Sequence, residues 1–255
     1  MAKHTSLTMR IRRGLLFVSF LGFPIVQFYL SPYLPFAGAM EGLVAGSLLV
    51  FAGLFLAGLF VGRAPCGWFM PCGGLQEACF HVRDRRIPTG PLDGPKFAIW
   101  VPWLSALIGV FVVRGVAPRL SPLYHIDGGI SVSQPWLYFI YYGVLLIFVG
   151  LAFALGKRAA CHYLCWVAPF MILGRRLGDA LRLPGLRLLP RSGAACTSCG
   201  TCSKACPMGV DPSPVARGEA ARLDECLLCG ECVDACPSLA LRLGLGRARR
   251  PARPS

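Results

Sequence analysis

Charged residues are scarce in this chain, and acidic ones are the scarcest. Asp, Glu, Lys and Arg make up only 15% of the 255 residues, with 12 acidic against 26 basic side chains. Hydrophobic residues account for 55%, and the mean hydropathy is +0.58. An ordinary water-soluble protein is therefore not expected. The composition is typical of a membrane protein that carries a smaller polar domain.

Common enzyme signatures are also missing. The sequence has no phosphate-binding glycine loop, no dinucleotide-binding fingerprint and no hydrolase nucleophile pattern. The formal net charge of +14 raises the question of nucleic acid. However, the basic residues lie beside apolar runs and in the C-terminal tail, so contact with anionic lipid is the simpler explanation. We expect no nucleic-acid partner.

Cysteine, in contrast, is abundant, with 13 residues. Eight of them form two copies of the run C-x2-C-x2-C-x3-C-P. In the bacterial ferredoxin arrangement, the first three cysteines of each run hold one 4Fe–4S cluster and the fourth crosses over to the other cluster. One predicted cluster is held by Cys196, Cys199, Cys202 and Cys236, and the other by Cys226, Cys229, Cys232 and Cys206.

The residues between these cysteines suit a cluster. Gly200 and Gly230 let the backbone approach it, and Pro207 and Pro237 turn the chain away after the fourth cysteine. A zinc ribbon is the alternative, but zinc sites usually present two separated C-x2-C knuckles. The other five cysteines are an odd number, which argues against a complete disulfide framework. Oxygen-sensitive clusters further indicate a reducing compartment.

Four apolar runs are each close to the ~20 residues that cross a membrane as a helix. They cover residues 14–34, 42–62, 97–116 and 136–156. The basic segment before the first run lacks a small-residue cleavage site, so we expect an uncleaved first span rather than a secretory signal. Arg12-Arg13 also allows a twin-arginine address, but no polar motif surrounds it.

Lysine and arginine predict the orientation. They are frequent before the first run, between the second and third, and after the fourth, and rare in the other two loops. The positive-inside rule therefore places both termini and the cysteine runs in the cytoplasm of a prokaryotic cell, with a multi-pass chain in its inner membrane.

The predicted fold is a membrane α-helical domain with four transmembrane helices, followed by an α+β two-cluster domain like a bacterial ferredoxin. Residues 1–165 form the membrane domain with its cytoplasmic cysteine loops, and 166–190 form an interfacial helix and linker. Residues 191–243 form the ferredoxin domain, and 244–255 a basic disordered tail.

The five remaining cysteines follow the cytoplasmic ends of the second and fourth runs. They are Cys66, Cys72, Cys79, Cys161 and Cys165. Cys161 and Cys165 are one helical turn apart and share a face. Thiolates gathered at a membrane edge indicate a further iron–sulfur or metal site. The alternative is that they are small apolar residues that fill space, because free cysteine buries well.

These features together resemble the NapH-type membrane ferredoxin proteins. The resemblance rests on C-G-W-x-x-P after one span, C-x3-C after another, and the C-terminal two-cluster run, and it covers nearly the whole chain. Relatives include the nitrous-oxide regulatory protein and iron–sulfur proteins of cytochrome oxidase assembly. The resemblance implies four spans, two C-x3-C-P motifs that face the cytoplasm, and quinol oxidation or electron relay.

The chain departs from this family pattern at both motifs. Met70 stands where the first motif has its second cysteine, and Cys72 is displaced by two residues. In the second motif Trp166 follows Cys165 in place of proline. The family's motif role therefore carries over to Cys66, Cys161 and Cys165, and its transfer to Cys72 or Cys79 is only a hypothesis.

His125 and Asp127 lie in the loop before the fourth run, on the predicted outer side. An imidazole beside a carboxylate can accept a proton from a quinol. An ordinary turn with two polar residues is the alternative. The most specific functional hypothesis is electron transfer between the quinone pool, or a membrane redox partner, and a cytoplasmic partner. An iron–sulfur maturation factor and a structural anchor are the other classes.

Overall fold

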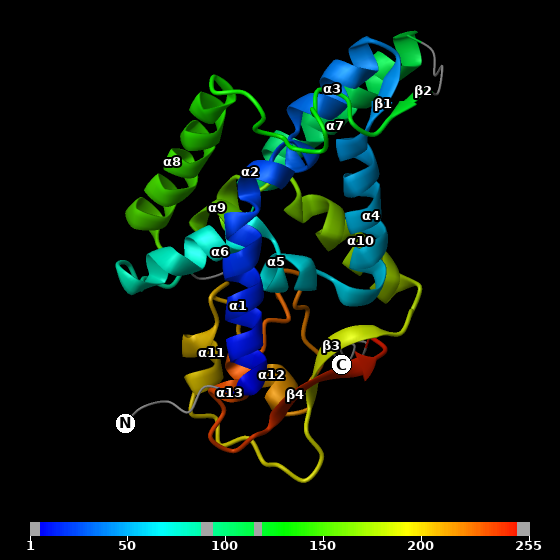
Figure 1. The fold of residues 1–255 in the computed structure, drawn as a ribbon. Helices are drawn as coiled ribbons and strands as arrows, with labels where there is room; N and C mark the ends of the chain where they lie inside the picture. Colours follow the sequence, from blue (N-terminus) through cyan, green and yellow to red (C-terminus); the bar gives the residue numbers. More distant parts are fainter. Residues whose placement is uncertain (1–5, 88–93, 115–118, 249–255) are drawn as a thin grey trace.

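The computed structural model describes residues 6–87, 94–114 and 119–248 (Figure 1). Helices occupy one part of the molecule and the ferredoxin domain the other. Several short helices lie between them, and they carry the cysteines outside the two C-terminal runs.

The N-terminal segment is a broken series of helices. Helix α1 covers Leu7–Leu21, and Ser6 caps it by accepting a hydrogen bond from the Met9 amide. Helix α1 ends at Gly22, just before Pro24, which has no amide hydrogen to continue the ladder. Helix α2 (Phe23–Val26), the 3-10 helix η1 (Phe28–Leu30) and helix α3 (Tyr33–Met40) follow. The first predicted span is thus not one straight helix.

The other apolar runs form single helices: α4 at Gly46–Val61, α7 at Pro95–Arg114 and α8 at Leu137–Leu155. Within the described residues, α7 and α8 are long and apolar enough to cross a membrane, whereas α4 is apolar but shorter. The predicted spans 97–116 and 136–156 correspond to these two helices. Four crossings remain a prediction.

Two loops meet at the end of the helices that lies away from the ferredoxin domain. Strand β1 (Leu43–Ala45) pairs in parallel with strand β2 (Arg119–Ser121), with Leu43 opposite Arg119. Strand β1 falls at the start of the second predicted span, 42–62, and β2 falls in the loop that was expected on the outer side of the membrane. Their pairing puts them at the same end of the molecule.

Short helices follow α4 and α8 at the opposite end. Helix α5 (Ala64–Trp68), helix α6 (Pro71–Ala78) and the 3-10 helix η2 (Cys79–His81) come after α4, and helix α9 (Ala159–Tyr163) comes after α8. Helix α10 (Ala168–Ala180) then packs along α4. Gly174 and Gly178 face the carbonyls of Phe55 and Leu59, so the absence of side chains permits close backbone contact.

The ferredoxin domain is closed by a two-stranded antiparallel sheet. Strand β3 (Gly185–Pro190) pairs with strand β4 (Leu241–Gly246), with Gly185 opposite Gly246. Helices α11 (Thr201–Ala205), α12 (Ser213–Ala216) and α13 (Glu231–Asp234) lie between these strands in the sequence. The structure therefore differs from the predicted boundaries, because β3 falls in the predicted linker and β4 extends three residues into the predicted tail. Residues 249–255 of that tail lie outside the described residues.

Buried ion pairs join the ferredoxin domain to the helices. Lys96 Nζ is 2.7 Å from the Glu225 carboxylate, which Arg63 also contacts, and Arg12 lies 2.8 Å from Glu231. The side chains of these three basic residues are no more than 1% exposed. Arg12, Arg63, Lys96 and Arg158 are all buried. These four basic side chains therefore do not make the predicted contact with lipid.

Candidate iron–sulfur site

The two cysteine runs adopt the same unusual backbone pattern. Two residues after the first cysteine of each run, Ser198 and Leu228 have positive φ angles of 54° and 49°. Gly200 and Gly230, two residues further, have φ angles of 70° and 85°. Left-handed conformations are costly for residues with a side chain and concentrate at functional sites. The repeated cysteine sequence therefore encodes a repeated, strained loop.

The structure brings together the second predicted ligand set, which we call the inner set. One cavity is lined by all four of its residues, Cys206, Cys226, Cys229 and Cys232. The fourth cysteine of the first run thus lies with the first three of the second run. Met208 and Leu227 also line this cavity, so the thiols lie in an apolar surrounding.

These thiols lie close enough for their charges to interact. Burial, with a smaller contribution from repulsion by the Cys206 thiolate, raises the pKa of Cys226 to about 11 and that of Cys229 to about 12. Cluster binding needs thiolates. The positive iron core of a cluster would supply the charge that stabilises four thiolates in this cavity.

The first predicted ligand set, which we call the outer set, lies nearer the surface. Cys202 and Cys236 are buried in one small core beneath β3 and β4, and Cys196 packs against it. Cys199 is exposed, and hydrogen bonds from Thr201 lower its pKa to about 7. Cys232 of the inner set packs against the same core, so the two sets are neighbours.

Both sets offer the donor chemistry of iron–sulfur binding. Amide hydrogens point at the sulfurs, with Leu228 N 3.4 Å from Cys226 Sγ and Ala240 N 3.3 Å from Cys236 Sγ. Such hydrogen bonds to cluster sulfurs tune the reduction potential. Among the described residues, no three Cys, His, Asp or Glu side chains lie close enough to hold one metal ion. A 4Fe–4S cubane is wider than a single ion, so the thiolates that bind it lie further apart than the ligands of one ion.

Four of the five cysteines outside the ferredoxin domain form another buried group, which we call the edge group. It consists of Cys66 in α5, Cys72 in α6, Cys161 in α9 and Cys165 just after α9. The four thiols are near enough for their thiolates to repel one another. Cys79 has no such interaction, and only burial raises its pKa. The displaced Cys72 therefore joins the group, whereas Cys79 does not.

Polar side chains that sequence reasoning missed surround the edge group. Gln76 Nε2 donates to Cys161 Sγ at 3.2 Å and to the Cys72 carbonyl at 3.3 Å. Arg158 Nη1 donates to the Cys66 carbonyl at 3.1 Å. Arg63 interacts electrostatically with Cys66, Cys161 and Cys165. The sequence holds a signal for both arginines. In R-A-P-C and R-A-A-C, an arginine stands three residues before Cys66 and before Cys161.

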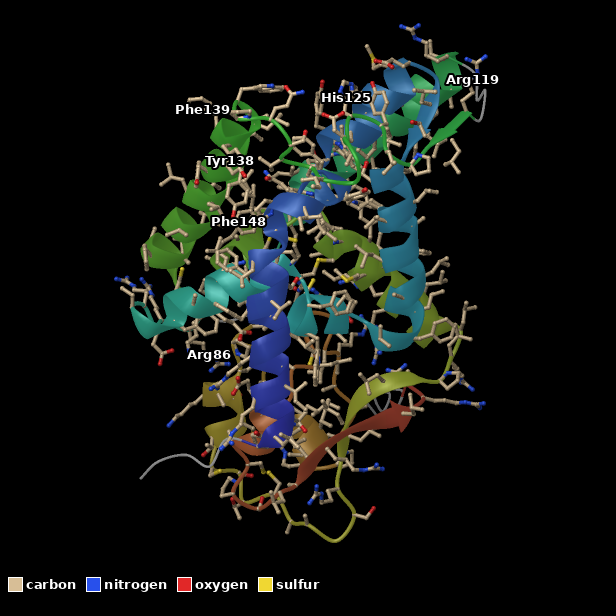
Figure 2. The ribbon with its side chains drawn as sticks, viewed as in Figure 1. Arg86, Arg119, His125, Tyr138, Phe139 and Phe148 are labelled. Atoms are coloured by element: carbon tan, nitrogen blue, oxygen red, sulfur yellow. The ribbon has the colours of Figure 1, made fainter. Side chains whose placement is uncertain are left out.

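His125 and Asp127 lie far from all of these cysteines. Figure 2 shows His125 near Arg119, at the end of the helices away from Arg86, and Arg86 donates to the Gly209 carbonyl of the ferredoxin domain. Asp127 accepts a hydrogen bond from the Ser133 hydroxyl at 3.0 Å. The structure thus places this pair in a loop held by its own polar contacts, and quinone binding there stays a prediction.

Comparison with known proteins agrees with the C-terminal assignment. Residues 195–241 match the family described as a 4Fe-4S dicluster domain. The methylamine utilization ferredoxin-type protein MauN of Paracoccus denitrificans (strain Pd 1222) is 27% identical over 205 residues, which are 76% of this chain and 66% of that protein. The chain thus spans just under two thirds of the length of this relative. No solved structure matches. The chain is therefore an iron–sulfur protein with a ferredoxin-like C-terminal domain.

Proposed function

We propose that this chain is a membrane-bound electron-transfer protein with two 4Fe–4S clusters in its C-terminal domain. The inner set would hold one cluster and the outer set the other. When bound, such clusters accept and release single electrons. The observation that carries the proposal is the fixed contact between the inner set and the short helices that follow α4 and α8.

This contact is close and specific. A Cβ atom on Gly67 in α5 would lie 2.5 Å from the Leu227 carbonyl, so only glycine fits there without a shift. Trp68 Nε1 donates to the Leu228 carbonyl at 3.1 Å. Leu227 and Leu228 lie between the first two cysteines of the second run. The helices therefore hold the inner set in place, as efficient electron transfer between two sites requires.

Iron content tests the number of clusters. The full-length protein, purified without oxygen, should contain at least about eight irons, as two cubanes require. Cys206→Ala should remove the signal of the inner cluster and keep that of the outer cluster, because its thiol lies with the second run. Cys202→Ala should have the opposite effect. Zinc in place of iron after anaerobic expression would refute the proposal.

The exposed surfaces of α7 and α8 support membrane insertion. Less than a quarter of the apolar window of each helix is buried inside the protein. Val113 and Phe139 are each 85% exposed, and Leu146 is 73% exposed. Apolar side chains at this exposure need a partner other than water, and lipid fits their composition.

We further propose four crossings with both termini and the ferredoxin domain in the cytoplasm. Reporters fused after Gly62, Gly156 and Ser255 should report cytoplasm, and a reporter near Gly128 should report the outside. An external signal at Ser255 would overturn this topology.

A quinol is the proposed membrane donor, and its site should lie near the edge group rather than at His125. Electrons released at His125 would have to cross most of the helical part of the molecule to reach the cysteines (Figure 2). Stopped-flow mixing of reconstituted protein with a reduced quinone analogue tests this. His125→Ala should leave cluster reduction unchanged, and no reduction in the wild type would exclude quinol as the donor.

A second candidate is a maturation factor that supplies electrons during assembly of a metalloenzyme. This candidate rests on the similarity to a ferredoxin-type protein that is named for methylamine utilization. The two candidates differ in their donor. Cluster reduction by a quinol supports the electron-transfer role, and cluster reduction by a cytoplasmic donor alone supports maturation.

A further inference from the structure

We propose that the edge group binds a third 4Fe–4S cluster, with Cys66, Cys72, Cys161 and Cys165 as its ligands. The binding site is inferred from the geometry of the edge group and from the charges around it. Its role as the entry point for electrons from the membrane rests on the electron-transfer function proposed above.

Three short helices and their connections converge to build the site. Helices α5 and α6 follow α4, and α9 follows α8, so the four thiols come from two distant parts of the sequence. Cys66 and Cys161 are each 4% exposed and belong to one hydrophobic core, against which Cys165 packs. Gln76 ties α6 to α9, because its Oε1 accepts from the Ala160 amide at 3.1 Å while its Nε2 donates to Cys161 Sγ.

The positive charges around the edge group favour a bound anion. Arg63 and Arg158 are no more than 1% exposed, and both interact with its cysteines. Arg63 Nε, Arg63 Nη2 and Arg158 Nε are buried without a hydrogen-bond partner among the described residues. A buried cation with unsatisfied donors is strongly unfavourable unless negative charge is nearby.

Glu225 and Glu77 are each shared between two buried cations. Arg63 shares Glu225 with Lys96, and Arg158 shares Glu77 with Arg12. Glu231 is the third carboxylate of this network, and it contacts Arg12. Arg63 and Arg158 thus each share a carboxylate with a second buried cation. An oxidised cubane with four thiolates carries a net charge of roughly −2 and would place further negative charge beside both arginines.

The spacing of the thiols argues against a single bound ion. No three of the described cysteines lie close enough to hold one ion, and all 13 cysteines are free rather than joined in disulfides. Four separated thiols with a glutamine amide aimed at one of them form the kind of cradle that a cubane occupies.

The edge group is also next to the inner set. Cys66, Cys161 and Cys229 belong to the same hydrophobic core, together with Leu227. The three cysteine groups therefore follow one another from the ends of α4 and α8 toward the far side of the ferredoxin domain. Electrons from the membrane would reach the edge group first.

The test uses the full-length protein, reconstituted with iron and sulfide under anaerobic conditions. We expect about twelve irons per chain, as three cubanes require. Cys165→Ser should lower the count by about four. Cys79→Ser is the matched control, because this cysteine comes from the same loops but lies outside the edge group, and it should leave the count unchanged.

Absolute counts separate this inference from the proposed function. Equal iron in the wild type and Cys165→Ser overturns the inference. A count of about eight in both leaves the proposed function intact, and a count near zero overturns both. A loss of about four irons from any starting count supports the inference. One equivalent of zinc or copper removed by Cys165→Ser would overturn it in favour of a single ion.

A second variant covers the case in which Cys165→Ser fails to fold. Gln76→Leu removes the hydrogen bond to Cys161 Sγ and keeps all thiols. We expect the midpoint potential of one cluster to fall while those of the other two stay constant, because hydrogen bonds to the sulfurs favour the reduced form. Unchanged potentials for every cluster would overturn the inference.

Discussion

Glu225 is the best place to test how the ferredoxin domain is held. Its carboxylate is the shared partner of Arg63 and Lys96, whose side chains are 0% exposed. Glu225→Gln keeps the size of the side chain and removes its charge, so Arg63 and Lys96 both lose the negative charge of this carboxylate. Removal of one partner from a buried ion pair costs about 3–5 kcal/mol. The remaining amide can still accept a hydrogen bond, which favours the lower value of about 3 kcal/mol.

This cost converts into a melting shift. For a protein of this size, 1 kcal/mol corresponds to about 2–4 °C, so we expect the Tm to fall by roughly 6–12 °C. Circular dichroism and the loss of cluster absorbance can follow melting of the anaerobic protein in lipid nanodiscs. Glu219→Gln is the matched control, because Glu219 pairs with Arg217 at the surface, and it should leave the Tm unchanged.

A second substitution shows whether unpaired charge is the cause. Lys96→Met removes one of the two buried cations that contact Glu225 in the wild type, so the Tm of the Glu225→Gln Lys96→Met double variant should lie above that of Glu225→Gln. Equal Tm values for Glu225→Gln, Glu219→Gln and the wild type would refute the argument that these buried pairs dock the domain.

Further predictions concern the same contact. Gly67→Ala should destabilise the docked state by about 1–3 kcal/mol, because the new methyl group meets the Leu227 carbonyl. Limited proteolysis should then release the ferredoxin domain faster. Gly150→Ala is the control, because Gly150 has open space around it, and it should not change the rate of release. Burial alone would raise the pKa of Glu77, but Arg158 and Arg12 outweigh burial and lower it. The stability from Glu77 should thus be complete above its unfolded pKa of about 4.5 and decline as the pH falls below it; Glu77→Gln should flatten this decline in melting curves taken between pH 5 and pH 3.

Some of the site was predictable because its chemistry is local. The two cysteine runs carry their own loop geometry, and the structure brings Cys206 to the second run as the ferredoxin spacing predicts. The strain at Ser198 and Leu228 was not predictable, because neither residue type favours a positive φ. The first predicted span, residues 14–34, is not one continuous helix, because the chain breaks at Gly22 and Pro24.

The buried arginines show a different limit. From the composition, we predicted that basic residues near apolar runs contact lipid, as exposed basic side chains beside a membrane usually do. Arg63 and Arg158 are instead enclosed because Glu225 and Glu77 come from other elements and reach them. Only the three-dimensional arrangement reveals these partners. The repeated R-A-x-C sequence was a signal that the two segments perform matching tasks.

The order of the ion-pair partners along the chain has a consequence for biogenesis. Arg63 precedes its partner Glu225 by 162 residues. During synthesis the N-terminal part emerges first. Arg63 is thus made long before Glu225 and, in the proposed topology, its positive charge can help to keep the end of α4 in the cytoplasm while the helices insert. Glu225 is synthesised later and then pairs with the same arginine, so a residue that favours the orientation of the helices also docks the ferredoxin domain.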